Sequence, residues 1–252
     1  LQGDLNIEDG TILENNKAND PTRKSTDFYG GAICSDFNDS HKKVINMTGG
    51  IIRDNRSYFG GGICLSSNTT LNMSGGEISN NQAYSGMTYN GTPYVSGGGI
   101  AAYRGSTINL SGDALITENS SEEIGGGISL GTIVPMPTGN ILNMTGGTIS
   151  GNKAGASGGG IFIQCGLSTG NSVANISEGK IINNAMTGEG YGNKHFGGGG
   201  IYVNGKAEIL RGKQGVLNLT NALITNNTAT EEGGGYASCP TSNTGINVKN
   251  GV

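Results

Sequence analysis

The sequence predicts an all-β protein built as a β-solenoid, a stack of about seven similar coils with three short strands in each coil. Three recurring segments carry this prediction: an alternating apolar–polar stretch, an Ile-x-x-Asn motif, and a glycine run closed by an apolar residue. Each segment is too short for a helix and alternates as a strand does. Glycine makes up 48 of 252 residues, well above its usual share of about 7%, which suits a chain with many tight corners.

The first segment of each repeat is an apolar–Asn–apolar triplet, usually followed by Ser or Thr. Because strand side chains point alternately to opposite faces, the flanking apolar residues are expected to line the interior and the Asn to point outward. The outward Asn and hydroxyl side chains would then form a flat grid on one face of the stack. The central asparagines are Asn6, Asn46, Asn72, Asn109, Asn143, Asn175 and Asn218.

The second segment is the Ile-x-x-Asn motif, which occurs seven times. We expect its Ile to enter one inward column and its Asn to turn inward as a ladder of amide hydrogen bonds, which satisfies backbone groups at the bend. The seven copies begin at Ile12, Ile52, Ile78, Ile116, Ile149, Ile181 and Ile224.

The third segment is a run of glycines that ends in an apolar residue, as in Gly97 to Ile100 and Gly158 to Ile161. Glycine permits the positive φ angles of tight corners. Parallel strands from successive coils would stack at a spacing of about 4.8 Å, so seven coils predict a rod roughly 34 Å long.

Insertions of different length leave the corner that follows the Ile-x-x-Asn motif, and most of the aromatic residues gather there. Loops on a rigid stack vary without disturbing the core, and Tyr and Phe give large contact areas at small entropic cost. This edge is therefore the predicted partner-binding surface. Its candidate residues are Tyr84, Tyr89, Tyr94, Tyr191 and Phe196.

Composition narrows the class of partner. The net charge is −4 and 13% of the residues are charged, which predicts neither nucleic-acid binding nor attachment to anionic lipid. No apolar run approaches the roughly 18 residues of a membrane span, so no membrane insertion by this chain is expected. Because the chain starts inside a repeat, we interpret residues 1–252 as a single β-helix domain and a fragment of a longer surface protein.

The Gly30-Gly31-Ala32-Ile33 tetrapeptide, alternating with an x-x-Asn motif, resembles the repeats of the chlamydial polymorphic outer-membrane proteins. That family pairs Gly-Gly-Ala-Ile with Phe-x-x-Asn, whereas this chain has Ile in place of Phe in all seven copies. The resemblance covers nearly the whole chain. It implies a right-handed parallel β-helix of the adhesin type, extracellular or on a bacterial cell surface, and it implies no catalytic residues.

An enzyme is the competing hypothesis, because polysaccharide lyases and hydrolases also use right-handed β-helices. Such enzymes need clustered carboxylates or a Ca²⁺ site with a basic catalytic residue. Asp is absent after Asp113, and His41 and His195 lie far apart in coil order. The best candidate for a cation site is a column of polar residues directly before the ladder Asn, formed by Glu14, Asp54, Asn80 and Glu118. Solvated corner residues are the simpler interpretation of this column.

Four cysteines are present, and two of them occupy the same position in adjacent coils. Cys34 and Cys64 each follow the closing Ile, so they should stack and point outward. A disulfide between them is geometrically possible, although side chains in parallel register are awkward to bridge. Cys165 and Cys239 are expected to stay unpaired, and no metal-ligand spacing appears.

These observations predict a non-catalytic bacterial β-helix without a cofactor, which binds a host receptor or a surface glycan through its insertion edge. Two alternatives remain beside it, a polysaccharide-active enzyme and a purely structural stalk. Exposed aromatics argue against the stalk, since a stalk gains nothing from them. The outward Asn and hydroxyl grid could bind a polysaccharide or ice, but such ladders also stabilise stacked coils without any ligand.

Overall fold

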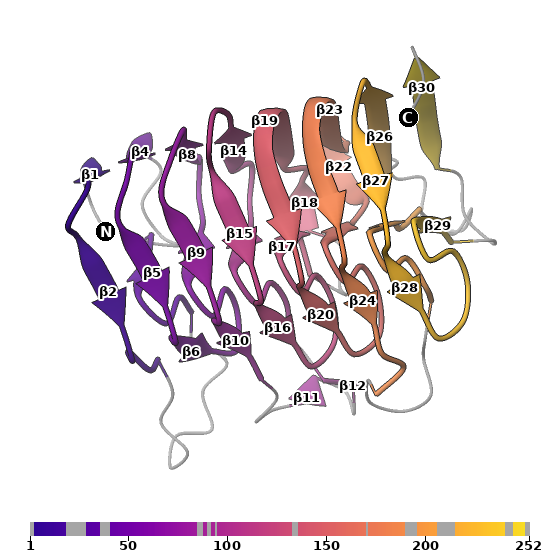
Figure 1. Cartoon of the computed structure of the whole chain (residues 1–252), viewed down its shortest axis with the longest axis horizontal. Helices are drawn as coiled ribbons and strands as arrows, with labels where there is room; N and C mark the ends of the chain where they lie inside the picture. The colour runs from indigo at the N-terminus through magenta and orange to yellow at the C-terminus, as the bar shows by residue number, and fades with distance from the viewer. Residues whose placement is uncertain are drawn as a thin grey trace.

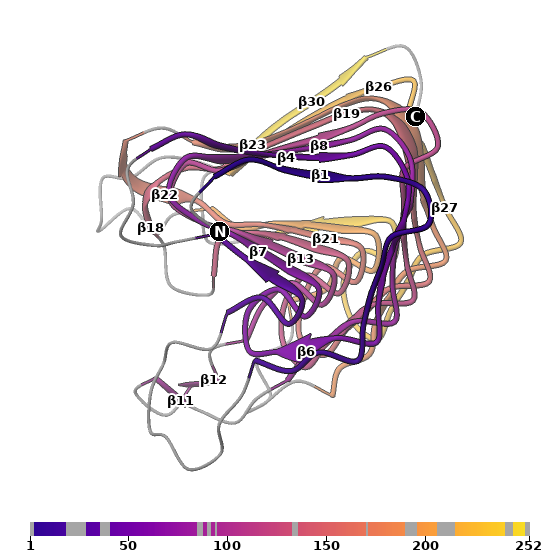
Figure 2. The same ribbon diagram turned by 90° about the vertical axis from the view of Figure 1, so that its left-hand side faces the viewer.

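The structure, a computed structural model, describes residues 3–18, 29–35, 41–84, 88–89, 92–93, 95–132, 136–169, 171–189, 196–205, 215–239 and 244–249. No helix occurs in these residues, and nearly all strand pairs are parallel. Successive repeats of the sequence lie side by side along the long axis (Figure 1), and the end view shows their strands superimposed around a common interior (Figure 2). The chain is therefore all-β with stacked parallel sheets, an arrangement compatible with the predicted β-solenoid.

The largest sheet has 13 strands and contains the first two segments of the repeats. The apolar–Asn–apolar segments form β1 (Leu5–Ile7), β4 (Lys43–Met47), β8 (Thr69–Met73), β14 (Thr107–Leu110), the first halves of β19 (Ile141–Ser150) and β23 (Ser172–Ile182), β26 (Gly215–Thr220) and β30 (Gly245–Lys249). The Ile-x-x-Asn segments form β2 (Ile12–Glu14), β5 (Ile51–Arg53), β9 (Glu77–Ser79), β15 (Leu115–Thr117), the second halves of β19 and β23, and β27 (Leu223–Thr225).

A six-stranded sheet follows the ladder asparagines and was not predicted. Three strands per repeat were expected, whereas most repeats contain a fourth strand of two residues at this corner. These short strands are β6 (Arg56–Ser57), β10 (Gln82–Ala83), β16 (Ser120–Ser121), β20 (Lys153–Ala154), β24 (Ala185–Met186) and β28 (Thr228–Ala229).

The glycine runs lead into a seven-stranded parallel sheet. Its strands are β3 (Ile33–Cys34), β7 (Ile63–Leu65), β13 (Ile100–Ala102), β17 (Ile128–Leu130), β21 (Ile161–Ile163), β25 (Ile201–Val203) and β29 (Tyr236–Ser238). Two small sheets lie outside the stack, β11 (Thr88–Tyr89) with β12 (Thr92–Pro93), which are antiparallel, and β18 (Met136–Thr138) with β22 (Gly166–Thr169), which are parallel.

Glycine is required at two positions of each run for different reasons. Gly97 has a φ of 69°, a left-handed conformation that strains any residue with a Cβ. Gly98 has negative φ, but a Cβ there would lie 2.3 Å from the carbonyl oxygen of Gly126 in the next repeat. The run therefore combines a tight corner with close backbone stacking between repeats.

The inward Ile column is confirmed in six of the seven predicted copies. Ile52, Ile78, Ile116, Ile149, Ile181 and Ile224 are mutual Cα partners on successive strands. Ile12 is the exception, because Leu13 is the partner of Ile52 and Ile12 is 51% exposed. The first copy therefore uses the overlapping motif Leu13-x-x-Asn16, and the sequence prediction of Ile12 as an inward residue was wrong.

The inward Asn ladder is confirmed in six of the seven predicted copies, whereas Asn16 takes the place of the predicted Asn15 in the first copy. The ladder is buried from Asn55 to Asn184. The amide of each asparagine donates to the side-chain oxygen of the asparagine in the next repeat, as from Asn81 to Asn119 at 2.9 Å and from Asn119 to Asn152 at 3.0 Å. Each side-chain amide also donates to a backbone carbonyl in the preceding repeat, as from Asn119 to Ile78 at 2.8 Å. The ladder thus satisfies the backbone groups at the corner.

The outward asparagines form a second ladder, on the outer face of the strands of the first segment. Their side-chain amides bond one another at 2.7–3.0 Å through Asn6, Asn46, Asn72, Asn109, Asn143, Asn175, Asn218 and Asn247. The pairing of β30 with β26 extends this ladder into the segment around Asn247.

A second buried core lies on the outer side of the seven-stranded sheet, where the sequence pattern predicts exposed residues. It contains Phe59, Cys64 and Tyr103 at one end and Phe162 and Tyr202 at the other. In several repeats two residues five positions apart have complementary volumes: Phe59 precedes Cys64, whereas the small residues Ser157 and Gly197 precede Phe162 and Tyr202. In these repeats one large and one small side chain together occupy the space between the corner and the sheet.

Truncation of this second core should destabilise the protein. Phe162 is 2% exposed and stacks on Tyr202 with ring centroids 5.7 Å apart. We expect Phe162→Ala to lower the free energy of unfolding by roughly 3–5 kcal/mol, since it removes buried area and leaves a cavity. Urea denaturation followed by circular dichroism measures the change. Phe196→Ala is the control, because Phe196 is 38% exposed and should cost about 1 kcal/mol or less; equal losses would show that Phe162 is not in a core.

Candidate functional site

The candidate site is a groove on the outer side of the six-stranded sheet, at the predicted insertion edge. It crosses β10, β16, β20 and β24 and has a volume of about 410 Å³. Two insertions flank it in sequence, residues 85–94 after β10 and residues 190–195 after β24. The small hairpin β11–β12 in the first insertion projects from the stack on this side (Figure 2).

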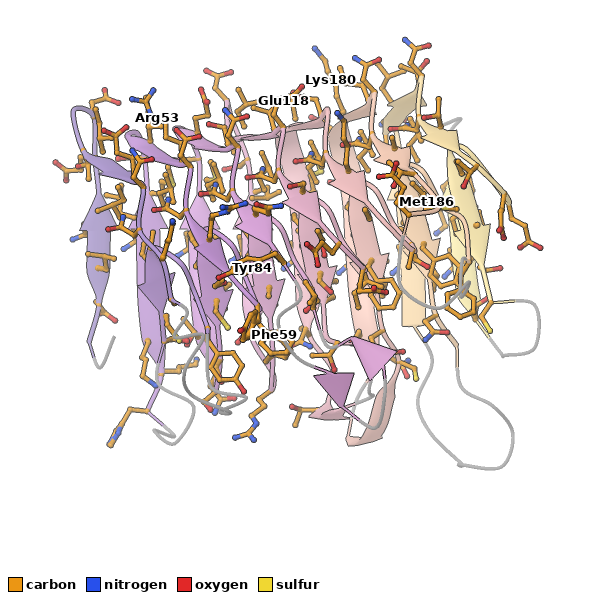
Figure 3. All side chains as sticks on the ribbon, turned by 90° about the horizontal axis from the view of Figure 1, so that it is seen from below. Arg53, Phe59, Tyr84, Glu118, Lys180 and Met186 are labelled. Atoms are coloured by element: carbon orange, nitrogen blue, oxygen red, sulfur yellow. The ribbon has the colours of Figure 1, made fainter. Side chains whose placement is uncertain are left out.

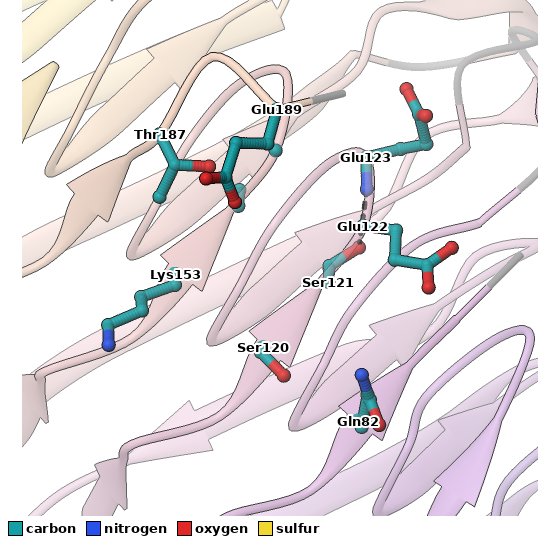
Figure 4. Close-up of a pocket in the computed structure, with 10 residues that line it drawn as sticks. Gln82, Ser120, Ser121, Glu122, Glu123, Lys153, Thr187 and Glu189 are labelled. Atoms are coloured by element: carbon teal, nitrogen blue, oxygen red, sulfur yellow. Dashed lines mark hydrogen bonds between the residues drawn. The ribbon is translucent and has the colours of Figure 1, made fainter. Parts of the chain in front are cut away.

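The groove is formed by residues of the short strands and of the turns that directly follow them. The lining residues come from four successive repeats and are mainly polar: Gln82, Ser120, Ser121, Glu122, Glu123, Lys153, Ala154, Gly155, Thr187 and Glu189. Glu122, Lys153 and Glu189 are exposed, whereas Glu123 is 4% exposed. The buried Glu123 backbone N–H donates to the Ser121 hydroxyl at 3.3 Å (Figure 4). The floor therefore offers hydroxyl, amide and carboxylate groups along one line.

Tyr84 borders this line at the end of β10. Its ring packs edge-on against Tyr58 with centroids 5.5 Å apart, and the Arg56 guanidinium lies 5.4 Å from its ring centre. The Arg56 side chain also donates to Gln82 Oε1. The Tyr84 phenol is neutral at physiological pH, as any tyrosine with an ordinary pKa of about 10 is, and burial raises its pKa further; its hydroxyl can therefore donate a hydrogen bond. Figure 3 shows Tyr84 on the same side of the stack as Phe59.

Phe196 enters the site region from the end of the second insertion. Its backbone N–H donates to the carbonyl of Ala156 at 3.1 Å, one residue beyond the Gly155 that lines the groove. Its ring is 38% exposed and lies 6.1 Å from the Tyr202 ring. Phe196 thus covers part of the second core and leaves part of its ring open to solvent.

The structure does not describe the side chains of the other three predicted site residues. Tyr89 lies on β11, for which the backbone alone is described, and Tyr94 and Tyr191 lie outside the described residues. Neither Tyr84 nor Phe196 lines the groove: Tyr84 lies two residues after the lining residue Gln82, and Phe196 bonds the residue that follows the lining residue Gly155. The placement of the other three side chains stays a prediction. Sequence reasoning missed the groove floor itself, because its residues belong to the unpredicted two-residue strands.

Comparisons with protein-family models, with curated proteins and with solved structures find no match.

The carboxylate column proposed as a cation site has a different composition. The residue before the first ladder asparagine is Asn15, not Glu14, because the first motif is shifted by one position. Glu14 instead bonds Arg53 on the neighbouring strand, with Oε2 and Nη2 2.7 Å apart. Asn15, Asp54, Asn80 and Glu118 all have φ between 53° and 58°, so this column marks a left-handed corner. No cluster of three or more His, Cys, Asp or Glu side chains suited to a metal occurs in the described part of the chain.

None of the four cysteines forms a disulfide in the structure. Cys34 and Cys64 are in register on β3 and β7 as predicted, but Cys64 is fully buried under the second core. The described residues also include no helix with the length and hydropathy of a membrane span.

Proposed function

We propose that the chain is a right-handed parallel β-helix of about seven coils, from a secreted or cell-surface bacterial protein. In this proposal it has no catalytic activity and binds a host receptor or a surface glycan at the insertion edge, as an adhesin does. The seven-stranded sheet, to which each repeat contributes one strand, supports the number of coils. The polymorphic outer-membrane protein resemblance supports the right hand and the surface location.

The observation that carries the proposal is the polar groove across β10, β16 and β20. It has a rigid floor, because its strands belong to a parallel sheet and each contributes one or two outward side chains. Loops that rise from such a floor can vary in sequence without loss of the core.

The floor chemistry favours a glycan over an apolar ligand. Hydroxyl, amide and carboxylate groups of Ser120, Gln82 and Glu122 are suited to hydrogen bonding with sugar hydroxyls. Aromatic rings at a groove border add stacking surface for a sugar ring, and Tyr84 provides one such ring. A protein receptor with a polar loop would satisfy the same groups, so both partner classes belong in the test.

The test is a screen of the full chain on an array of defined glycans and on a panel of host-receptor ectodomains. For the best binder we expect Glu122→Gln and Tyr84→Ala each to weaken binding about tenfold. Combined replacement of Tyr89, Tyr94 and Tyr191 by Ala should also weaken it. Glu118→Gln is the matched control, since Glu118 is an exposed carboxylate of the same repeat outside the groove.

Melting temperatures separate binding from folding in this experiment. Because Glu122 is exposed, Glu122→Gln should melt as the wild type does, so lost binding in that variant supports the groove. Intact binding in both groove variants, or equal loss in the Glu118→Gln control, would reject the groove. A screen without any binder would reject the adhesin function.

A further inference from the structure

Cys34 and Cys64 are neighbours in the seven-stranded sheet. They are mutual Cα partners on the parallel strands β3 and β7. Neighbouring strands are about 4.8 Å apart, within the range of roughly 4.4–6.8 Å between the Cα atoms of a disulfide. Both side chains leave the same face of the sheet, away from the interior that contains Ile63 and Leu65.

The two thiols differ in access to solvent. Cys34 is half-buried, and its thiol donates to the carbonyl of Ser35 at 3.3 Å. Cys64 is fully buried in the second core, with Tyr58, Phe59 and Tyr103 in the same cluster. Burial and the adjacent Cys34 raise the pKa of the Cys64 thiol. A reagent from solvent therefore meets Cys34 first.

We propose that Cys34 and Cys64 form a disulfide between the first two repeats when the protein meets a small-molecule disulfide oxidant. The Cys34 thiolate attacks one sulfur of the oxidant, forms a mixed disulfide and releases one thiol. The Cys64 sulfur then attacks Cys34 Sγ, and its proton passes to the departing sulfur, which leaves as the second thiol. The two cysteines are oxidised by two electrons in total, and the oxidant is reduced to two thiols.

The other two cysteines provide an internal comparison. Cys165 follows β21 and Cys239 follows β29, and β25 lies between these two strands in the sheet. The direct neighbour of Cys64 on its other side is Ala101. The sheet register therefore brings one pair of thiols together and keeps the other pair apart.

The bond would link β3 to β7 covalently. It would close a loop that consists of the chain between the two cysteines, which contains β4, β5 and β6. A cross-link that closes such a loop lowers the conformational entropy of the unfolded chain and so stabilises the folded state. The oxidised protein should consequently melt a few degrees higher than the reduced protein. The disulfide is independent of the proposed glycan binding, so either proposal can fail alone.

The experiment uses the full chain, first reduced and then incubated with oxidised glutathione. After unfolding in excess iodoacetamide, mass spectrometry should find two alkylated cysteines, Cys165 and Cys239, and a linked peptide pair containing Cys34 and Cys64. Cys34→Ser should abolish the linked pair and the rise in melting temperature. Cys239→Ser is the control and should keep both.

Three outcomes would overturn the proposal. Four alkylated cysteines after oxidation would show that the pair does not close. A stable glutathione adduct on Cys34 would show that Cys64 cannot reach it. A linked peptide pair that joins other cysteines would show that the register of β3 and β7 does not direct the bond.

Discussion

Replacement of Ile149 by Asp is expected to lower the free energy of unfolding by about 4 kcal/mol or more, because it places an unpaired charge in the interior. Ile149 is completely buried and lies between Ile116 and Ile181 in the inward column. Stability in a stacked-repeat protein depends on contacts between nearest neighbours, so the loss should extend to the repeats on both sides. Urea denaturation with circular dichroism measures the free energy, and amide hydrogen exchange locates the affected repeats.

Ile141→Asp is the matched control for this substitution. Ile141 belongs to the same strand, β19, but points outward and is 38% exposed. A charge there remains hydrated, and its cost should stay near 1 kcal/mol or less. Equal stability of Ile149→Asp and the wild type would show that the column does not face inward.

Removal of one rung of the buried Asn ladder should have the second-largest effect. Asn119 donates to Ile78 O and to Asn152 Oδ1, and its own Oδ1 accepts from the backbone and side-chain N–H groups of Asn81 at 3.0 and 2.9 Å. Asn119→Ala leaves several of these buried groups without a partner. Each such group costs about 1–3 kcal/mol, so we expect a loss of roughly 3 kcal/mol or more by urea denaturation.

Asn109→Ala provides the comparison on the outward ladder. Asn109 also bonds an asparagine on each side, but it is half-buried and water can replace its partners. Its loss should cost about 1 kcal/mol. If both alanine variants lost the same stability, the burial of the inner ladder would not explain its contribution.

The periodic part of the fold was predictable from sequence because the repeats are in register. The inward column from Ile52 to Ile224 and both asparagine ladders follow from spacing alone. The first repeat misled the prediction because Ile12-x-x-Asn15 and Leu13-x-x-Asn16 overlap. Leu13, not Ile12, pairs with Ile52, so the second motif is the one used. The local sequence alone does not show which of the two residues pairs with the neighbouring strand.

The second core and the groove floor were less predictable for a different reason. The second core depends on complementary volumes five residues apart, such as Gly197 with Tyr202, and a hydrophobicity pattern does not contain this information. Aromatic residues such as Tyr58 and Phe59 were therefore expected at an exposed edge, whereas they are buried. The groove floor consists of small polar residues on two-residue strands, which give no periodic signal.

The measurement that tests the proposed binding surface most directly is hydroxyl-radical footprinting of the full chain, with and without the best binder from the screen. Phe196 and Ile141 are both 38% exposed, so they report on the insertion edge and on the outward Asn face from equal starting exposure. If the ligand binds at the insertion edge, oxidation of Phe196 and Tyr84 should fall severalfold on binding, while oxidation of Ile141 should not change. Protection of Ile141 with no change at Phe196 and Tyr84 would place the ligand on the outward Asn face and contradict binding at the insertion edge.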